Sequence, residues 1–261
     1  MESRFWEAAR RGKVDAVKMI LRDNPTLDVN WRNPEENQST ALRQACADGQ
    51  DPIAAILLAH PDIDVNLKNR DGYTPLYSAT YCGRTACVRL LLKDPRVMPN
   101  EPNALGFLPV HRAVFYRHDD IIKWWIASGR EMDLGKPGDV EKTDAIGRAK
   151  NGGKTDVVTL LERFKENPVE TRHAMRVDLG LLDELAAEMF ALVVFVSDGL
   201  LQSNSTTPSP AARYFSIASQ LPLDLQMVLC NRVFGSPKDF VLSRTSEPGF
   251  HLLARTTTWQ Q

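Results

Sequence analysis

The sequence has almost no net charge and no long hydrophobic run. Lys and Arg together number 32 against 33 Asp and Glu, a formal net charge of −1, which leaves no overall field to attract nucleic acid or an anionic membrane. The most apolar stretch, residues 185–196, contains Glu188 and is much shorter than the roughly 20 apolar residues that span a bilayer. We therefore expect no nucleic-acid partner and no membrane span.

Cysteine is also scarce, and a secretion signal is missing. The four cysteines show no Cys-x-x-Cys spacing and no histidines at zinc-site intervals, which favours free thiols in a reducing compartment. The amino-terminal residues, MESRFWEAARRGK, carry charges where a signal peptide needs an apolar core. We expect a cytoplasmic protein, with the nucleus as the open alternative.

What the sequence does contain is a pattern that recurs through residues 1–165. Residues 69–92, NRDGYTPLYSATYCGRTACVRLLL, predict a tight turn, a short helix, a second turn and a second helix. The turn residue between those helices is Gly83, and its counterparts are Gly12, Gly49, Arg117 and Gly152. The intervals are 37, 34, 34 and 35 residues. One such unit cannot bury its apolar face alone, so the copies must stack.

The packing positions follow the same period. A small residue stands four places before the turn at Ala8, Ala45, Ala79 and Ala113, and Arg148 takes that place in the fifth copy. Apolar residues five, eight and nine places after the turn form one face of each second helix, as with Val88, Leu91 and Leu92. Three connectors contain a proline and end on Asn30, Asn66 and Asn100, which is typical of an extended link between helices.

The third copy resembles an ankyrin repeat. Thr74-Pro75-Leu76-Tyr77-Ser78-Ala79, followed by Gly83 and residues 88–92, is similar to the ankyrin motif Thr-Pro-Leu-His-x-Ala with its period of about 33 residues. The resemblance implies an all-α solenoid of about five repeats with short hairpin-like loops, and a carboxy-terminal helical region after it. The domains we predict are 1–165 as repeats whose first and last copies are caps, 166–202 as a helical extension packing on the repeats, 203–212 as a flexible linker, and 213–261 as a helical segment.

The carboxy-terminal part supports one further resemblance. Residues 170–201 have apolar positions spaced for one helix, and a second helix is predicted to start at Leu221-Pro222. Residues 186–254 resemble a region found in large ankyrin-repeat families of eukaryotic microbes. That resemblance implies a recurring architecture and no particular activity.

No segment carries a convincing catalytic motif. Gly152-Gly153-Lys154-Thr155 is the nearest approach to a phosphate-binding loop, but Arg148 stands where that loop needs its first glycine, and helices flank the segment. We interpret it as a turn between helices. The histidines are scattered, and His111 occupies the histidine slot of the ankyrin motif, where we expect it to hydrogen-bond within the turn. We expect no enzyme activity, no cofactor, no metal and no small-molecule substrate.

A partner surface is predicted at the positions that the period leaves free of packing, the turn tips and the exposed end of each first helix, on the concave face that the ankyrin resemblance implies. The partner-binding candidates in the third and fourth copies are Arg70, Asp71, Tyr73, Tyr81, Leu105, Phe107, Phe115 and Tyr116. Further residues at equivalent positions are Asn37, Ser39, Ala47, Asp48, Cys82, Ala104, Lys150 and Asn151. Exposed aromatic side chains are typical of binding hot spots. The alternative is that the carboxy-terminal region folds back and covers them.

Two functions are predicted from these features. The first is a non-enzymatic module or scaffold that binds an unidentified protein partner, because a repeat stack presents a large rigid surface. The second is a substrate adaptor of a ubiquitin ligase. Residues 213–261 resemble an F-box in the order of Leu221, Leu225, Leu229, Val233, Phe240 and Phe250, although Gly235-Ser236-Pro237 interrupts them early.

Overall fold

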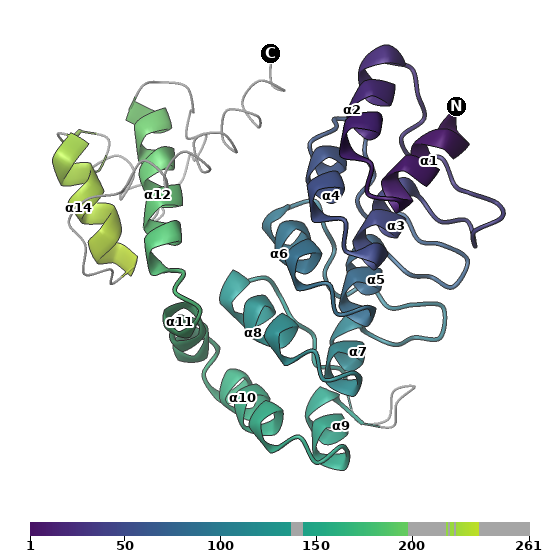
Figure 1. Cartoon of the computed structure of the whole chain (residues 1–261). Coiled ribbons are helices and arrows are strands. Elements are labelled where there is room, and N and C mark those ends of the chain that lie inside the picture. The colour runs from purple at the N-terminus through teal and green to yellow at the C-terminus, as the bar shows by residue number, and fades with distance from the viewer. Residues whose placement is uncertain (137–142, 198–217, 219, 222, 235–261) are drawn as a thin grey trace, which may run out of the picture. The chain divides into compact units, whose positions relative to one another are not determined.

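The computed structural model describes residues 1–136, 143–197, 218, 220–221 and 223–234 (Figure 1). Within these residues the regular elements are helices, and the one bridge between extended segments joins Asn33 and Ser39. The chain divides into two compact units, residues 1–175 and residues 176–261, which are described separately below. No helix in the described ranges is long and apolar enough to cross a membrane.

The first unit consists of five helix pairs followed by the start of α11. The pairs are α1 (Glu2–Arg10) with α2 (Val14–Asp23), α3 (Ala41–Asp48) with α4 (Asp51–Leu58), α5 (Pro75–Tyr81) with α6 (Thr85–Lys93), α7 (Pro109–Phe115) with α8 (Asp119–Ser128), and α9 (Ala145–Asn151) with α10 (Thr155–Glu166). The expected all-α stack of about five units is confirmed.

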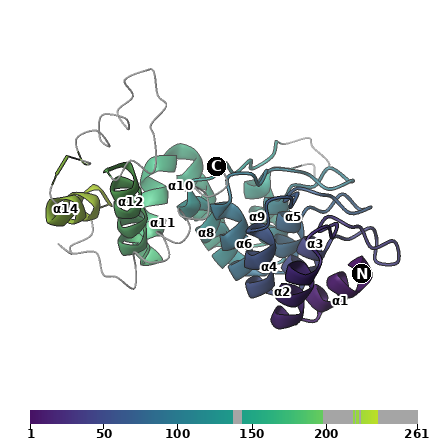
Figure 2. The ribbon, with the colours of Figure 1, turned by 90° about the horizontal axis from the view of Figure 1, so that it is seen from above.

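The pairs stack into two layers. The first helices α1, α3, α5, α7 and α9 pack in succession, and α2, α4, α6 and α8 form the second layer beside them (Figures 1 and 2). The loops that join one pair to the next project on the side of the first helices (Figure 1). Residues from all of these elements can therefore share one surface made of first helices and loops.

Local sequence explains where the first helices begin. The Thr74 side chain accepts a hydrogen bond from the Tyr77 backbone N–H at 3.0 Å, and Pro75 follows as the first helical residue. Thr40 and Asp144 cap α3 and α9 in the same way, while Leu108 precedes Pro109 in α7 without a side-chain cap. An N-cap satisfies an orphan backbone donor, and proline is pre-shaped for the first turn.

The core lies between the layers at the predicted positions. Ala45, Ala79 and Ala113 are completely buried, because a larger side chain would separate the two helices of a pair. The second helices bury Leu57, Leu91, Trp125 and Leu161 among others. The four cysteines are free.

The turn between paired helices requires a left-handed residue, and the structure corrects one assignment. Gly12, Gly49, Gly83 and Arg117 all have positive φ, as the repeat pattern predicts, but in the fifth copy the left-handed residue is Gly153, with φ +63°. Gly152 has φ −87° and ends α9. The fifth copy is thus shifted by one residue, and its small buried residue is Ala149 rather than Arg148.

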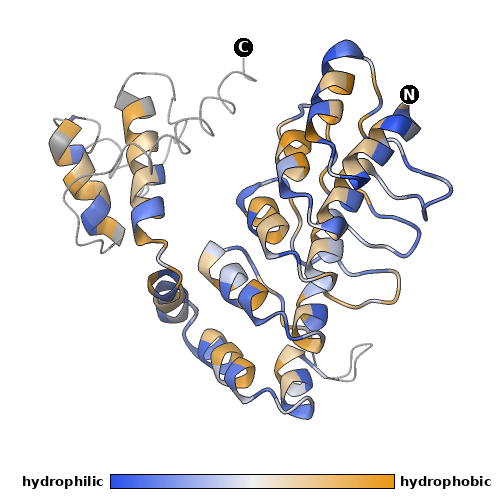
Figure 3. Cartoon of the chain, viewed as in Figure 1, coloured by the Kyte–Doolittle hydropathy of each residue, from blue (hydrophilic) through white to orange (hydrophobic). Residues whose placement is uncertain are grey.

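Asparagine side chains tie the connectors together. The Asn30 amide donates to the Asp62 carbonyl at 2.7 Å and accepts from the Asp64 N–H at 2.8 Å. Asn66 makes the same pair of bonds to Arg96 and Met98. Figure 3 shows that the projecting loops before α3 and α5 are mostly hydrophilic. Each connector is therefore hydrogen-bonded to the next one. The sequence predicts extended connectors but does not predict these hydrogen bonds.

The last pair continues into α11 (Pro168–Asp178), and α12 (Leu182–Ser197) follows. The single helix predicted over 170–201 is wrong, because Gly180 takes φ +66° and separates two helices. In the second unit α12 packs on α14 (Leu223–Phe234), with Phe190, Val193 and Cys230 in their shared core. The predicted linker, 203–212, lies outside the described residues. The packing of residues 166–202 on the repeats stays a prediction.

A candidate partner-binding surface on the first helices

Aromatic rings from the third and fourth copies form one continuous row. The Tyr73 ring stacks on Tyr77 with centroids 4.5 Å apart and lies 5.8 Å from Tyr81. Tyr81 meets Tyr116 edge to face at 5.0 Å, and Tyr116 meets Phe115 in the same manner at 4.8 Å. Phe115 is 50% exposed and Tyr116 is 41% exposed. The row therefore begins in the core at Tyr77 and ends in solvent.

Two hydroxyl groups link the third copy to the fourth. The Tyr81 and Tyr116 hydroxyl oxygens are 3.1 Å apart and share a hydrogen bond. This hydrogen bond, together with some burial, raises the pKa of Tyr81 to about 12. Tyr81 is therefore neutral at physiological pH, and both rings offer apolar faces with polar edges.

Two arginines are held against ring faces, one on the half-buried Phe107 and one on the exposed Phe115. The Arg112 guanidinium lies 4.0 Å from the centroid of Phe107, and its Nε donates to the Tyr77 hydroxyl at 3.0 Å. The Arg148 guanidinium lies 4.7 Å from the centroid of Phe115. A cation over a ring face is attracted by the ring quadrupole and is fixed in orientation. The surface therefore combines exposed rings with oriented positive charges.

The loop tips form a second part of this surface. The Arg70 N–H donates to the Asn37 carbonyl at 3.1 Å, and the Ala104 N–H donates to the Asp71 carbonyl at 2.9 Å. These bonds align successive tips, with Arg70 and Asp71 exposed. Leu105, at the most apolar tip, is 65% exposed.

The structure sorts the predicted residues into two groups. Tyr73, Tyr81, Phe115 and Tyr116 share the aromatic row, and Arg70, Asp71 and Leu105 lie on the loop tips, while Phe107 lies beneath Arg112. Two of the further positions do not offer a free surface. Ser39 is fully buried and accepts a hydrogen bond from Arg43 at 2.6 Å, and Lys150 pairs with Glu162 at 2.7 Å.

The repeat pattern does not identify three side chains that build this surface, the buried Tyr77 and the two arginines Arg112 and Arg148. In the sequence Tyr77 is only a residue of the repeat motif, whereas in the structure it anchors the row of rings. Arg112 and Arg148 each stand one place before the small residue of their first helix, Ala113 and Ala149. The shared register of two arginines was the signal in the sequence, and the one-residue error in the fifth copy concealed it.

In the third, fourth and fifth repeats, the residue after the turn hydrogen-bonds to the first helix of the preceding repeat. Arg84 Nε donates to the Ala47 carbonyl at 3.0 Å, and His118 Nε2 donates to the Tyr81 carbonyl at 3.2 Å. Lys154 Nζ donates to the carbonyls of Val114 and Phe115, the latter at 2.9 Å. The Lys154 ammonium group therefore caps the carboxy-terminal end of α7. This agrees with interpreting Gly152-Gly153-Lys154-Thr155 as a turn rather than as a phosphate-binding loop.

His111 is bonded outside its own turn, contrary to the sequence-based expectation. Its Nε2 lies 3.2 Å from the Leu134 carbonyl in the connector that leads to α9. Burial lowers the pKa of His111, and this hydrogen bond partly opposes the shift. In the described ranges, no group of three His, Cys, Asp or Glu residues could hold a metal ion.

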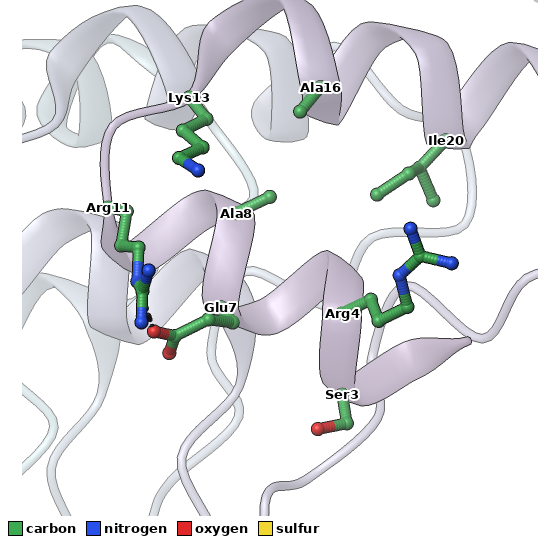
Figure 4. A pocket seen from close by; sticks show the side chains of 8 residues that line it. All are labelled: Ser3, Arg4, Glu7, Ala8, Arg11, Lys13, Ala16 and Ile20. Carbon is green, nitrogen blue, oxygen red and sulfur yellow. Dashed lines mark hydrogen bonds and ion pairs between the residues drawn. The ribbon is translucent and has the colours of Figure 1, made fainter.

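A hollow of about 380 Å³ lies on the outward face of the first helix pair (Figure 4). The side chains that line it are Ser3, Arg4, Glu7, Ala8, Arg11, Lys13, Ala16 and Ile20. Glu7 pairs with Arg10 at 2.9 Å and also with Arg11, and the hydrogen bond from Arg10 lowers the pKa of Glu7 to about 2. An open hollow lined by paired charges resembles the solvated end of a stack more than a ligand site.

Comparison with known proteins supports the architecture. The family model for ankyrin repeats, with three copies, matches residues 5–103. Residues 5–103 are ankyrin repeats. The fourth and fifth helix pairs repeat the same geometry beyond the matched region. The match ends before residues 213–261 and gives no support to the F-box alternative, and Phe240 and Phe250 of that pattern lie outside the described residues.

Curated relatives match a short part of their own length. The chain is 32% identical over 101 residues to the SMC5-SMC6 complex localization factor protein 1 of Bos taurus, which covers 39% of this chain and 10% of that protein. It is 34% identical over 90 residues to the cortactin-binding protein 2 of Dasypus novemcinctus, covering 33% of this chain and 5% of that protein. The chain thus spans a tenth or less of these relatives. The ankyrin repeats indicate a protein interaction module.

Proposed function

We propose that this chain is a non-enzymatic module that binds a protein partner on the first-helix surface of its ankyrin repeats. The observation that carries the proposal is the row of rings from Tyr73 to Phe115, which ends in two side chains that are 41% and 50% exposed. Exposed aromatic side chains on a rigid support are favourable anchors, because they bury large area at little entropic cost.

The relatives support the class of function and nothing finer. Their names describe a localization factor for a complex and a binding protein for cortactin. Both names refer to association with other proteins. Because the shared segment is a small part of each relative, we take from them only the general class, protein association.

The test is a comparison of interactomes between matched variants. Proteins that bind the full chain are quantified by affinity purification and mass spectrometry, for the wild type and for the double variant Tyr81→Ala with Phe115→Ala. The control is Met19→Ala, because Met19 is 55% exposed on α2 in the second layer. Far-ultraviolet circular dichroism and urea midpoints establish that each variant is folded.

We expect the specific partners to be depleted at least 10-fold with the double variant and to be unchanged with the control. A 10-fold depletion corresponds to a loss of about 1.4 kcal/mol of binding free energy, and we expect the loss of two anchoring rings to remove at least this much. If a folded double variant retained the same partners at the same abundance, the first-helix surface would not be the binding site.

A further inference from the structure

We infer that the portion of the surface in the fourth and fifth repeats binds an acidic peptide segment, with a carboxylate against Arg112 and Arg148 and an apolar side chain against Phe115. This inference deepens the proposed function and rests on it. It is carried by the positions of the two guanidinium groups and by the charges around them.

Both guanidinium groups are pre-organised. Arg112 is held between the Phe107 ring and the Tyr77 hydroxyl, and Arg148 is held over the half-exposed Phe115 ring. A planar guanidinium that is already stacked loses less conformational entropy when it binds a carboxylate than a flexible side chain does. The ring and the charge are adjacent, so one peptide segment can contact both.

Positive charges accumulate in this region. Burial and the charge of Arg112 lower the pKa of Arg148, and burial and the charges of Arg117 and Arg148 lower the pKa of Lys154 against the opposing charge of Asp119. Two causes of these shifts are therefore loss of water and repulsion between like charges. A carboxylate from a partner would counter both, because it replaces water and neutralises the repulsion.

The other half of the surface carries charges of both signs, with Arg70 exposed beside its acidic residues. Asp48 and Asp71 are exposed in the second and third repeats, and Asp71 accepts a hydrogen bond from the Asn37 amide. These carboxylates would repel an acidic segment, which would be attracted more strongly toward the fourth and fifth repeats. Complementary charge thus fixes where along the row a peptide binds.

The experiment uses the full chain and a random library of displayed 12-residue peptides. After selection, enriched sequences are compared with the starting library for Asp and Glu content, and the best peptide is synthesised together with its Asn and Gln isostere. Binding is measured by fluorescence anisotropy at low and at high salt. We expect acidic sequences with at least one large apolar residue, a 10-fold or larger loss for the isostere, and weaker binding at high salt.

The matched variants are Arg148→Gln and Arg89→Gln. Arg89 lies 3.7 Å from the Trp124 ring centroid and comes from α6 in the second layer, so its variant removes the same kind of ring-stacked charge from the other layer. We expect Arg148→Gln to weaken binding of the acidic peptide at least 10-fold and Arg89→Gln to change it less than 2-fold. If a variant is unstable, the salt dependence of binding to the wild-type chain still tests whether opposite charges hold the peptide.

The outcomes separate this inference from the proposed function. If the selected peptides were neutral or basic, or if the isostere bound equally well, the acidic preference would be wrong. Should those peptides still require Tyr81 and Phe115, the proposed function would stand alone. A selection that enriched nothing, or peptides indifferent to both the rings and Arg148, would overturn both.

Discussion

Replacing Gly83 by alanine tests how the repeats are joined. Gly83 has φ +70°, and an added Cβ would lie 2.6 Å from His118 Cε1. Gly153 occupies the same position in the fifth repeat with φ +63°, and an added Cβ there would have nothing within 4 Å. The two substitutions therefore impose similar backbone strain in different surroundings.

The structure predicts a difference between them. The left-handed backbone costs alanine about 1–2 kcal/mol, of which about 0.5–1 kcal/mol is offset because alanine restricts the unfolded chain. Gly153→Ala should thus destabilise by about 0.5–1 kcal/mol. In Gly83→Ala the His118 ring must also move, and loss of its hydrogen bond to the Tyr81 carbonyl, 3.2 Å long, adds about 0.5–1.5 kcal/mol. The total for Gly83→Ala is about 1–2.5 kcal/mol.

Urea unfolding, monitored by circular dichroism, measures the free energy of unfolding of both variants. The slope of this free energy against urea concentration is compared between variants, because midpoints report stability only when the slopes agree. A second series in the His118→Ala background isolates the clash, because Gly83→Ala should then cost about the same as Gly153→Ala. Equal costs of the two glycine substitutions in the wild-type background would refute the interaction between Gly83 and His118.

Three further substitutions probe single positions. Arg117→Gly should stabilise the chain by about 0.5–1 kcal/mol, because Arg117 holds φ +61° without glycine's freedom; an unchanged urea midpoint would contradict this. Tyr116→Phe should move the pKa of Tyr81 from about 12 toward 10, because the shared hydrogen bond is lost, and a tyrosine-selective NMR titration that found no shift would be inconsistent with it. Because burial lowers the pKa of His111 below 6.5, the unfolded state takes up its proton first as pH falls, so stability declines below about pH 6.5. His111→Gln should reduce that decline in urea titrations at pH 5 and pH 7.5, and an identical pH dependence would count against the assignment.

The repeat architecture can be predicted from the sequence, because its signals are local. A turn residue with positive φ, a small residue four places earlier and an apolar face on the second helix were each readable from spacing, and even Arg117 was correctly placed at a turn. The turn residue predicted for the fifth repeat was wrong, because either Gly152 or Gly153 can adopt a left-handed conformation. Only the folded backbone shows that Gly153 adopts it.

The tertiary structure alone decided what the surface is made of. The period placed Tyr81, Phe115 and Tyr116 at unpacked positions, but it could not show that Tyr77 anchors their row or that Arg112 and Arg148 lie on neighbouring rings. The contacts of Arg148 with Phe115 and of Arg112 with Tyr77 join side chains about one repeat apart in sequence. Their geometry depends on the rotation and spacing between stacked helix pairs, which packing sets and which no single repeat encodes.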